Sequence, residues 1–137
     1  MNTTHDNKQL MQRIFDALAD GDGRPFVDAM DEDFVWEIAG HSAWSRRWEG
    51  KAAVRRELFK PLFARFATTY TNRALRFVAE DEHVVVECRG DVLTHGGAAY
   101  RNTYCYVCRL AGGKLKHLVE YMDTEHAMQV LGAPETA

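Results

Sequence analysis

The segment from Val84 to Thr124 constrains the fold more than any other part of the chain. It contains three apolar runs, and the sequences THGGAA and AGGK that join them supply glycine to the turns. Apolar runs of strand length joined by short, glycine-containing turns are typical of consecutive antiparallel strands. The segment therefore predicts a three-stranded antiparallel meander.

Charged residues alternate with apolar ones along the first of these strands. Because side chains on a strand point alternately to its two faces, Glu87, Arg89, Asp91 and Leu93 share one face, and the Val and Cys residues between them take the other. Unpaired charges are costly to bury. If the charged face points into the protein, we expect the charges to serve chemistry.

Length and composition set the class of protein. A chain of 137 residues predicts one domain over 1–137, with a core over about 8–132, and 46% hydrophobic residues are ordinary for a globular core. A net charge of -3 gives no reason to expect a nucleic acid or an anionic membrane as partner. No apolar run approaches the ~18 residues of a membrane span. The first residues lack the apolar core of a signal peptide, and the three cysteines are interpreted as reduced thiols, which predicts a cytoplasmic protein.

Periodicity assigns the remaining elements. It predicts a helix over about 5–20, a short helix from Pro25, a strand over 31–40, an irregular segment pinned by two tryptophans, a helix from Gly50 to about Phe66, a strand over 68–80, the meander, and a last helix after Asp123. Pro61 predicts a kink or division of the third helix. Helices segregated from an antiparallel sheet predict the α+β class.

The order of these elements carries a resemblance to a known family. Together with EGK at residues 49–51 and YRNTYCYVCRLAGGKLKHLVEYMDT at residues 100–124, it resembles the NTF2-like superfamily from about Leu10 to Leu131. The SnoaL-like branch is the most similar, and it includes polyketide cyclases and relatives of ketosteroid isomerase and limonene-1,2-epoxide hydrolase. The resemblance implies a cone, in which a strongly curved mixed or antiparallel sheet wraps around N-terminal helices and encloses a pocket. It implies less about function, because this scaffold hosts enzymes, binding proteins and assembly domains.

The epoxide hydrolase comparison supplies candidate catalytic residues. The run from Cys88 to Leu93 resembles that family's Arg-x-Asp-Val-Leu string, and the run from Glu120 to Asp123 resembles its Asp-Tyr-Phe-Asp string. The resemblance implies that Arg89, Asp91 and Glu120 are catalytic: one acid activates water, the other protonates the epoxide, and the arginine holds both.

Other positions depart from the relatives. The Tyr and Asn that position water in the hydrolase align with Trp36 and Ile38, so this chain lacks that water clamp. The oxyanion tyrosine of ketosteroid isomerase falls near Ile14, and its proton-shuttling Asp falls at Ile38, or at Glu37 with a one-residue slip. Classical steroid isomerisation is therefore disfavoured.

The three candidate residues also make chemical sense without the family. Two acids beside one cation in an apolar cavity have pKa values that are pushed apart, so one can act as base and the other as acid. Two alternatives stay open: a structural ion-pair cluster that stabilises the strands or a dimer face, and binding of a ligand by charge.

The strand over 100–108 and several apolar residues supply a candidate pocket lining. Tyr100, Asn102, Tyr104 and Tyr106 share a face, and if it faces the pocket, Asn102 and Tyr104 offer polar contacts to a substrate. Tyrosines are also simply favourable strand residues. The candidate apolar contacts are Phe15, Leu18, Trp36, Ile38, Leu93 and Leu118, each of which could instead be plain core.

Metal and cofactor sites are not expected. Cys105 and Cys108 lie three apart on a strand and so point to opposite faces, and the six histidines form no metal-binding pair. Asp123 precedes a helix, and we interpret it as an N-cap rather than an active-site acid.

Two classes of function remain. The first is a cofactor-independent acid/base enzyme that isomerises, cyclises or opens an epoxide in a small, mostly apolar substrate. The second is a non-catalytic domain that binds small molecules or a partner. We expect no nucleic-acid or membrane partner. We also expect a homodimer through the outer sheet face, where Thr103, Cys105 and Val107 would lie.

Overall fold

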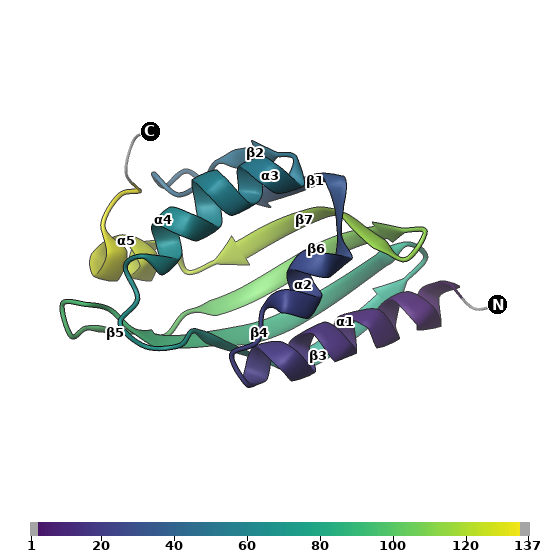
Figure 1. The fold of residues 1–137 in the computed structure, drawn as a ribbon, viewed down its shortest axis with the longest axis horizontal. Helices are drawn as coiled ribbons and strands as arrows, with labels where there is room; N and C mark the ends of the chain where they lie inside the picture. Colours follow the sequence, from purple (N-terminus) through teal and green to yellow (C-terminus); the bar gives the residue numbers. More distant parts are fainter. Residues whose placement is uncertain (1–2, 135–137) are drawn as a thin grey trace.

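The computed structural model describes residues 3–134 and shows an α+β fold in which helices cover one face of a curved sheet (Figure 1). The elements in chain order are α1 (Thr3–Ala19), α2 (Arg24–Ala29), β1 (Met30–Ile38), β2 (Arg47–Glu49), α3 (Lys51–Ala53), the π-helical η1 (Val54–Phe59), α4 (Lys60–Phe63), β3 (Thr71–Glu80), β4 (His83–Leu93), β5 (Ala99–Tyr100), β6 (Thr103–Ala111), β7 (Lys114–Met122) and α5 (Thr124–Leu131). The predicted α+β class is confirmed.

The sheet is mixed, with the strand order β2-β1-β7-β6-β4-β3 and with β5 paired to β4. Strands β4, β6 and β7 are antiparallel neighbours, which confirms the predicted meander. Strand β1 lies parallel to β7, and their register pairs Trp36 with Leu118 and Ile38 with Glu120. Two segments that are far apart in sequence are thereby brought side by side in the sheet.

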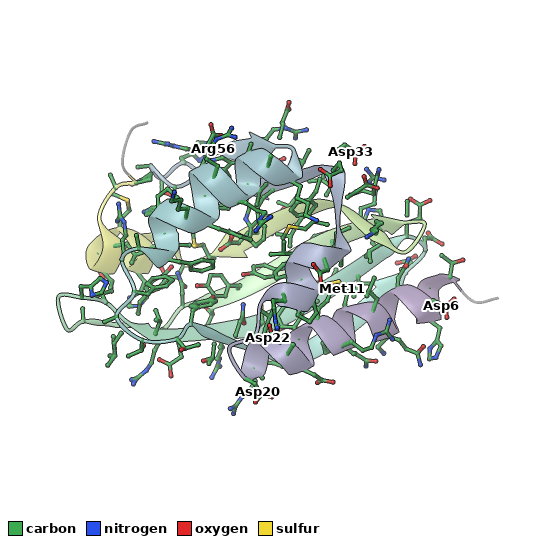
Figure 2. The ribbon with its side chains drawn as sticks, in the orientation of Figure 1. Asp6, Met11, Asp20, Asp22, Asp33 and Arg56 are labelled. Carbon is green, nitrogen blue, oxygen red and sulfur yellow. The ribbon has the colours of Figure 1, made fainter. Side chains whose placement is uncertain are left out.

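The core lies between the inner face of the sheet and the helices. Alternate residues of β1 are buried, among them Phe34, Trp36 and Ile38, as expected for a strand with one buried face. Helix α1 presents Met11 and Ile14 to β3 and β4, while Asp6 of the same helix is exposed (Figure 2). No described helix is long and apolar enough to cross a membrane.

The segment over 41–50 differs from the expected irregular loop, because Arg47–Glu49 forms β2 and pairs with β1. Both tryptophans of this segment are buried, as the sequence predicted. Trp48 pairs with Trp36 across the two strands, and Trp44 Nε1 donates a hydrogen bond of 2.7 Å to the carbonyl oxygen of Gly132.

The third helix is irregular where proline was expected to disturb it. Residues Val54–Phe59 are π-helical and α4 follows directly, with Pro61 in its first turn. Proline has no N–H to donate to the preceding turn, so the hydrogen-bond pattern must change beside it. Val54 and Leu58 are buried, whereas Phe63 is 44% exposed.

Gly90 provides the first testable prediction. A Cβ at this position would meet the hydroxyl of Tyr70 and would lie 2.9 Å from Tyr104 Cε2, so the G90A variant must displace one of these rings. We expect G90A to lower the free energy of unfolding by about 1–3 kcal/mol, measured by denaturant titration. G96A is the matched control, because a Cβ there has no neighbour closer than 3.9 Å. Equal stability of the two variants would contradict the packing described here.

Candidate functional site

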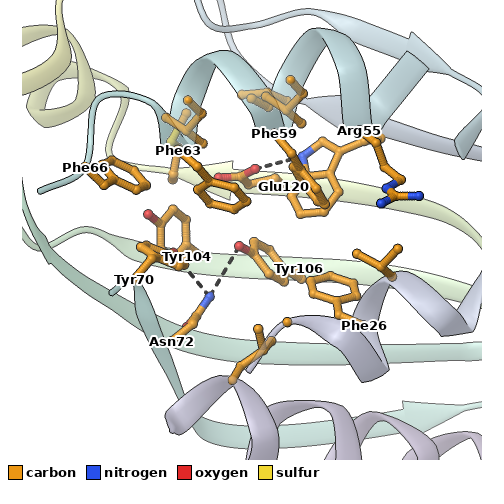
Figure 3. A pocket seen from close by; sticks show the side chains of 18 of the residues that line it. Phe26, Arg55, Phe59, Phe63, Phe66, Tyr70, Asn72, Tyr104, Tyr106 and Glu120 are labelled. Carbon is orange, nitrogen blue, oxygen red and sulfur yellow. Dashed lines mark hydrogen bonds between the residues drawn. The ribbon is translucent and has the colours of Figure 1, made fainter. Parts of the chain in front are cut away.

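A cavity of about 460 Å³ lies between the inner face of the sheet and the helices (Figure 3). Its walls are mostly aromatic and aliphatic, as is usual for sites that bind small molecules. The residues that line it are Leu18, Gly23, Arg24, Phe26, Val27, Asp28, Trp36, Ile38, Trp44, Lys51, Arg55, Leu58, Phe59, Leu62, Phe63, Phe66, Tyr70, Asn72, Tyr100, Tyr104, Tyr106, Glu120, Met122, Ala127 and Leu131.

Glu120 is the buried ionisable group of this cavity. It extends from β7, is 6% exposed, and its Oε1 accepts a hydrogen bond of 2.8 Å from Trp36 Nε1 on the neighbouring β1. Burial raises the pKa of Glu120 from 4.5 to about 7, and the hydrogen bond from Trp36 opposes this rise. A carboxyl group with such a pKa can both accept and donate a proton near neutral pH.

Tyrosine hydroxyls supply hydrogen-bond donors on the same wall. Tyr104 and Tyr106 come from β6, where Tyr106 pairs directly with Glu120 across the sheet, and Tyr70 precedes β3. Burial raises the pKa of both Tyr104 and Tyr106 well above the ordinary value, so their hydroxyls keep their protons at neutral pH. Neutral hydroxyls of this kind can donate to an oxygen that gains negative charge.

Asn72 connects these tyrosines. Its Nδ2 donates long hydrogen bonds to the hydroxyls of Tyr106, at 3.4 Å, and Tyr70, at 3.5 Å (Figure 3). Its Oδ1 is buried and has no hydrogen-bond partner among the described residues 3–134. Because a buried polar atom without a partner is costly, this oxygen is available to a donor on a bound molecule or to a water.

Arg89 and Asp91 lie outside the cavity, so the expectation that they converge there with Glu120 is wrong. Both side chains are exposed on the outer face of β4, and Asp91 Oδ1 pairs with Arg101 Nε at 3.2 Å. Glu120 points to the inner face. The three residues therefore cannot act as one catalytic set on a single bound molecule.

The cross-strand register gives the physical reason. Residues that pair across antiparallel strands share a face, and β4 pairs Glu87 with Cys105 and Arg89 with Thr103. Thr103 and Cys105 were themselves expected on the outer face, so a consistent register would have placed Arg89 and Asp91 there as well. The sequence correctly predicted which residues of β4 share a face, but not which of its faces points into the protein.

Among the predicted binding residues, Leu18, Trp36, Ile38 and Tyr104 line the cavity. Phe15 and Leu118 are buried in the core but do not line it, and Leu93 is 43% exposed.

Asn102 is also buried away from the cavity wall. Its Nδ2 donates to Tyr100 Oη at 2.9 Å and to the carbonyl oxygen of Asp123 at 3.1 Å, so its role here is to hold a tyrosine and a helix start. Asp123 caps α5 by accepting a hydrogen bond of 3.1 Å from the backbone N–H of His126, as predicted.

Several lining residues were not predicted from the sequence. Phe59, Phe63 and Phe66 lie in the segment predicted as the third helix, and apolar helical spacing alone does not tell a core face from a cavity wall. Tyr70 and Asn72 alternate at the start of β3, and that spacing was the available signal.

Within residues 3–134 no group of three His, Cys, Asp or Glu residues could hold a metal ion. Cys108 is buried and Cys105 is partly exposed on the other face of β6, and both are free, so their predicted separation is confirmed.

The raised pKa of Glu120 predicts a stability that depends on pH. The folded protein holds this proton up to about pH 7, whereas the unfolded chain loses it near 4.5, so the group's contribution to stability falls as pH rises through this window. E120Q cannot ionise, and we expect it to gain stability over the wild type by up to about 3 kcal/mol between about pH 5 and about pH 8.

Denaturant titration across this pH range measures the gap between the two proteins. D91N, which removes a carboxylate from the opposite face of the sheet, is the matched control. A gap between wild type and E120Q that stays constant from about pH 5 to about pH 8 would contradict the raised pKa.

The fold has many structural relatives. A putative SnoaL-like polyketide cyclase from Jannaschia sp. CCS1 shares a TM-score of 0.78 at 17% identity, over 98% of this chain and 97% of that one. A putative isomerase from Bacillus subtilis gives 0.73 at 20% identity, over 96% of both chains. TerC, co-crystallised with polyporic acid, gives 0.77 at 15% identity, over 93% of this chain and 99% of that one. At these identities the likeness shows the fold.

The sequence itself shows the family. A comparison with curated proteins found no match. The family model for the SnoaL-like domain matches residues 11–118, which is most of the chain and includes β1, β4, β6 and most of β7. The protein belongs to the SnoaL-like domain family, on the NTF2-like fold.

Proposed function

We propose that this protein is a cofactor-independent acid/base enzyme that moves a proton on a small, mostly apolar substrate, with Glu120 as the catalytic residue. The observation that carries the proposal is a buried carboxyl group with a pKa of about 7 on the wall of an apolar cavity. Structural carboxylates are normally paired with a cation or left in water, and Glu120 is neither.

The geometry favours chemistry next to a carbonyl group. The Glu120 carboxylate takes a proton from the carbon beside the carbonyl, the C–H electron pair moves into an enolate, and a tyrosine hydroxyl donates a hydrogen bond to the enolate oxygen. Return of the proton to another carbon completes an isomerisation. Attack of the enolate carbon on a second carbonyl closes a ring instead.

Epoxide opening receives less support. That reaction, as implied by the hydrolase resemblance, uses two acids and an arginine around one substrate. Asp91 and Arg89 lie on the outer face, and the positions of the water-holding Tyr and Asn carry Trp36 and Ile38. Isomerisation and cyclisation need one base and one donor to the oxyanion, and the cavity offers both. Two of the structural relatives, the putative polyketide cyclase and the putative isomerase, carry names that belong to the same reaction classes.

A non-catalytic binding domain is the second candidate function. The observation that favours it is the apolar, ring-lined wall, which can bind an aromatic molecule without any chemical step. The two candidates differ in what Glu120 does: a binding domain needs its shape and hydrogen bond, whereas an enzyme needs its proton.

Deuterium exchange tests the enzyme directly. Enolisable aryl ketones such as 2-tetralone, incubated in D₂O with the protein, should lose the signal of the proton beside the carbonyl faster than buffer alone allows. We expect E120Q, which keeps the shape and the hydrogen-bond acceptor, to slow this exchange at least about 100-fold. Proton NMR measures the exchange, and aromatic epoxides in the same panel test the hydrolase alternative.

D91N is the matched control for this experiment, because it removes the acid that only the sequence analysis placed in the site. We expect D91N to exchange at the wild-type rate. Loss of exchange in D91N would contradict this proposal and support the catalytic set of Arg89, Asp91 and Glu120. Tight binding of the ketones by both wild type and E120Q, with no exchange by either, would favour the binding domain.

We also propose a homodimer through the outer sheet face. Val78, Val85, Val107 and Val119 are successive cross-strand partners on β3, β4, β6 and β7, and they form an apolar row across that face. Tyr121, beside this row, is 51% exposed. An apolar surface of this kind is typical of a protein interface.

Light scattering, which measures the mass of the particle in solution, tests this expectation. The wild type should have the mass of two chains at micromolar concentration, and V107E should have the mass of one chain, because a charge in the middle of the row would be left unpaired in the interface. A monomeric wild type would contradict the dimer.

A further inference from the structure

The rim of the cavity carries more positive than negative charge. Four charged residues line it: Arg24 and Asp28 from α2 on one side, and Lys51 and Arg55 from α3 and η1 on the other. Lys51 and Arg55 are four positions apart on one continuous helical segment, so their side chains lie on the same side of it. Figure 3 shows Arg55 directed from this helix toward Phe26 rather than away from the cavity.

Within residues 3–134, Lys51 and Arg55 take part in no ion pair. Two other arginines are paired: Arg24 Nε, across the rim, lies 2.9 Å from Asp22 Oδ1, and Arg56 Nη2, on η1, lies 3.7 Å from Glu57 Oε1. The carboxylate of Asp28 acts on Arg24, on its own helix. The two cations on the α3–η1 side are therefore available to an anion at the opening.

The interior gives an anionic group no such partner. The cations that line the cavity are those of the rim, and the carboxyl group inside it is that of Glu120, which would repel an anion whenever it is ionised. A permanent negative charge buried beside Glu120 would have no cation to pair with, which is costly. An anionic ligand can thus bind in only one direction, with its charge at the rim and its uncharged part inside.

The interior also indicates the shape of the uncharged part. Rings from α2, β1, β6 and the third helix surround the cavity, and neighbouring centroids are 5.8 Å apart for Phe26 and Trp36 and 5.6 Å apart for Trp36 and Tyr106. These rings contact one another and together form an aromatic wall, and such a wall favours a ring-containing body through stacked and edge contacts.

We propose that the substrate is an aromatic carboxylate, whose ring system lies against the aromatic walls while Lys51 and Arg55 hold its carboxylate at the rim. The planar guanidinium of Arg55 can donate two parallel hydrogen bonds to such a group, and Lys51 adds a second positive charge. The inference rests on the proposed function in taking this cavity as the substrate site. Anchoring a remote group at the rim would also place the reacting carbon at a set distance from Glu120, which is how binding energy serves catalysis.

Two isosteric probes test the proposal by binding alone. Anthracene-2-carboxylate and anthracene-2-carboxamide have the same ring system and differ in charge, and their fluorescence reports binding. We expect the wild type to prefer the carboxylate. K51Q and R55Q should each weaken carboxylate binding roughly two- to fivefold, because exposed ion pairs contribute modestly, and should leave carboxamide binding unchanged. Added salt should reduce the preference in the wild type.

R56Q is the matched control, because Arg56 is the next residue on η1, does not line the cavity and points away from the sheet in Figure 2. It should keep the wild-type preference. Equal affinity of the wild type for the two probes, or a preference that survives in the K51Q/R55Q double variant, would overturn the proposal.

E120Q separates this inference from the proposed function. It should retain the preference for the carboxylate, since Glu120 lies inside and the selectivity arises at the rim. If the protein prefers the carboxylate but catalyses no proton exchange, the proposed enzyme activity is contradicted and the proposed ligand class is supported. If the protein catalyses proton exchange on neutral ketones but shows no preference for the carboxylate, the proposed enzyme activity is supported and the aromatic carboxylate is contradicted as its substrate.

Discussion

The hydrogen bond from Trp36 Nε1 to Glu120 Oε1 is the interaction on which the site depends. It joins β1 to β7, and among residues 3–134 it is the one hydrogen bond that the buried carboxyl group receives from a side chain. Without this donor the desolvated carboxyl would be costlier to ionise, and with a cation beside it the pKa would return toward its ordinary value. A single neutral donor leaves Glu120 between these limits, with a pKa of about 7.

The parallel pairing of β1 with β7 makes this bond possible. The register sets Ile38 opposite Glu120 and Trp36 opposite Leu118, so the indole lies diagonally across from the carboxyl group on the inner face. A slip of one residue would turn every side chain of β1 to the other face and remove both the indole and Phe34 from the core. The same register therefore serves packing and chemistry, because Trp36 is at once a core ring and the hydrogen-bond donor.

The walls of the cavity are shaped by Gly90 on β4 and by the π-helical turn before Pro61. Gly90 lies on the inner face of β4, where a side chain would collide with Tyr70 and Tyr104, so its missing Cβ lets two rings approach the sheet. The π-helical turn before Pro61 carries Leu58 and Phe59 over the opening of the sheet, and π-turns are often found at functional sites. The result is a helix layer that covers the sheet without filling the space beneath it.

Local pattern was sufficient for much of this structure. The alternation in β4, β6 and β7, the glycine turns between them and the cap at Asp123 depend on neighbouring residues, so the sequence predicted the meander, the α+β class and the start of α5. The resemblance to the epoxide hydrolase also placed Glu120 in the cavity, which is confirmed, but it wrongly placed Arg89 and Asp91 beside it. The short β2 was missed, because three residues carry too little periodicity to be told from a loop.

The tertiary structure alone decided which face of each strand points inward. The alternation of side chains along β4 puts Glu87, Arg89 and Asp91 on one face and Val86 and Cys88 on the other. It does not say which of the two faces is buried, and the family motif favoured the wrong one. Packing breaks that symmetry: burying the valines and the cysteine removes apolar area from water at no electrostatic cost, whereas burying the charges would have required partners that the inner face lacks. The sequence by itself determined which residues share a face. The packing of the sheet against the helices determined that Glu120 is buried in an aromatic-lined cavity, away from Arg89 and Asp91.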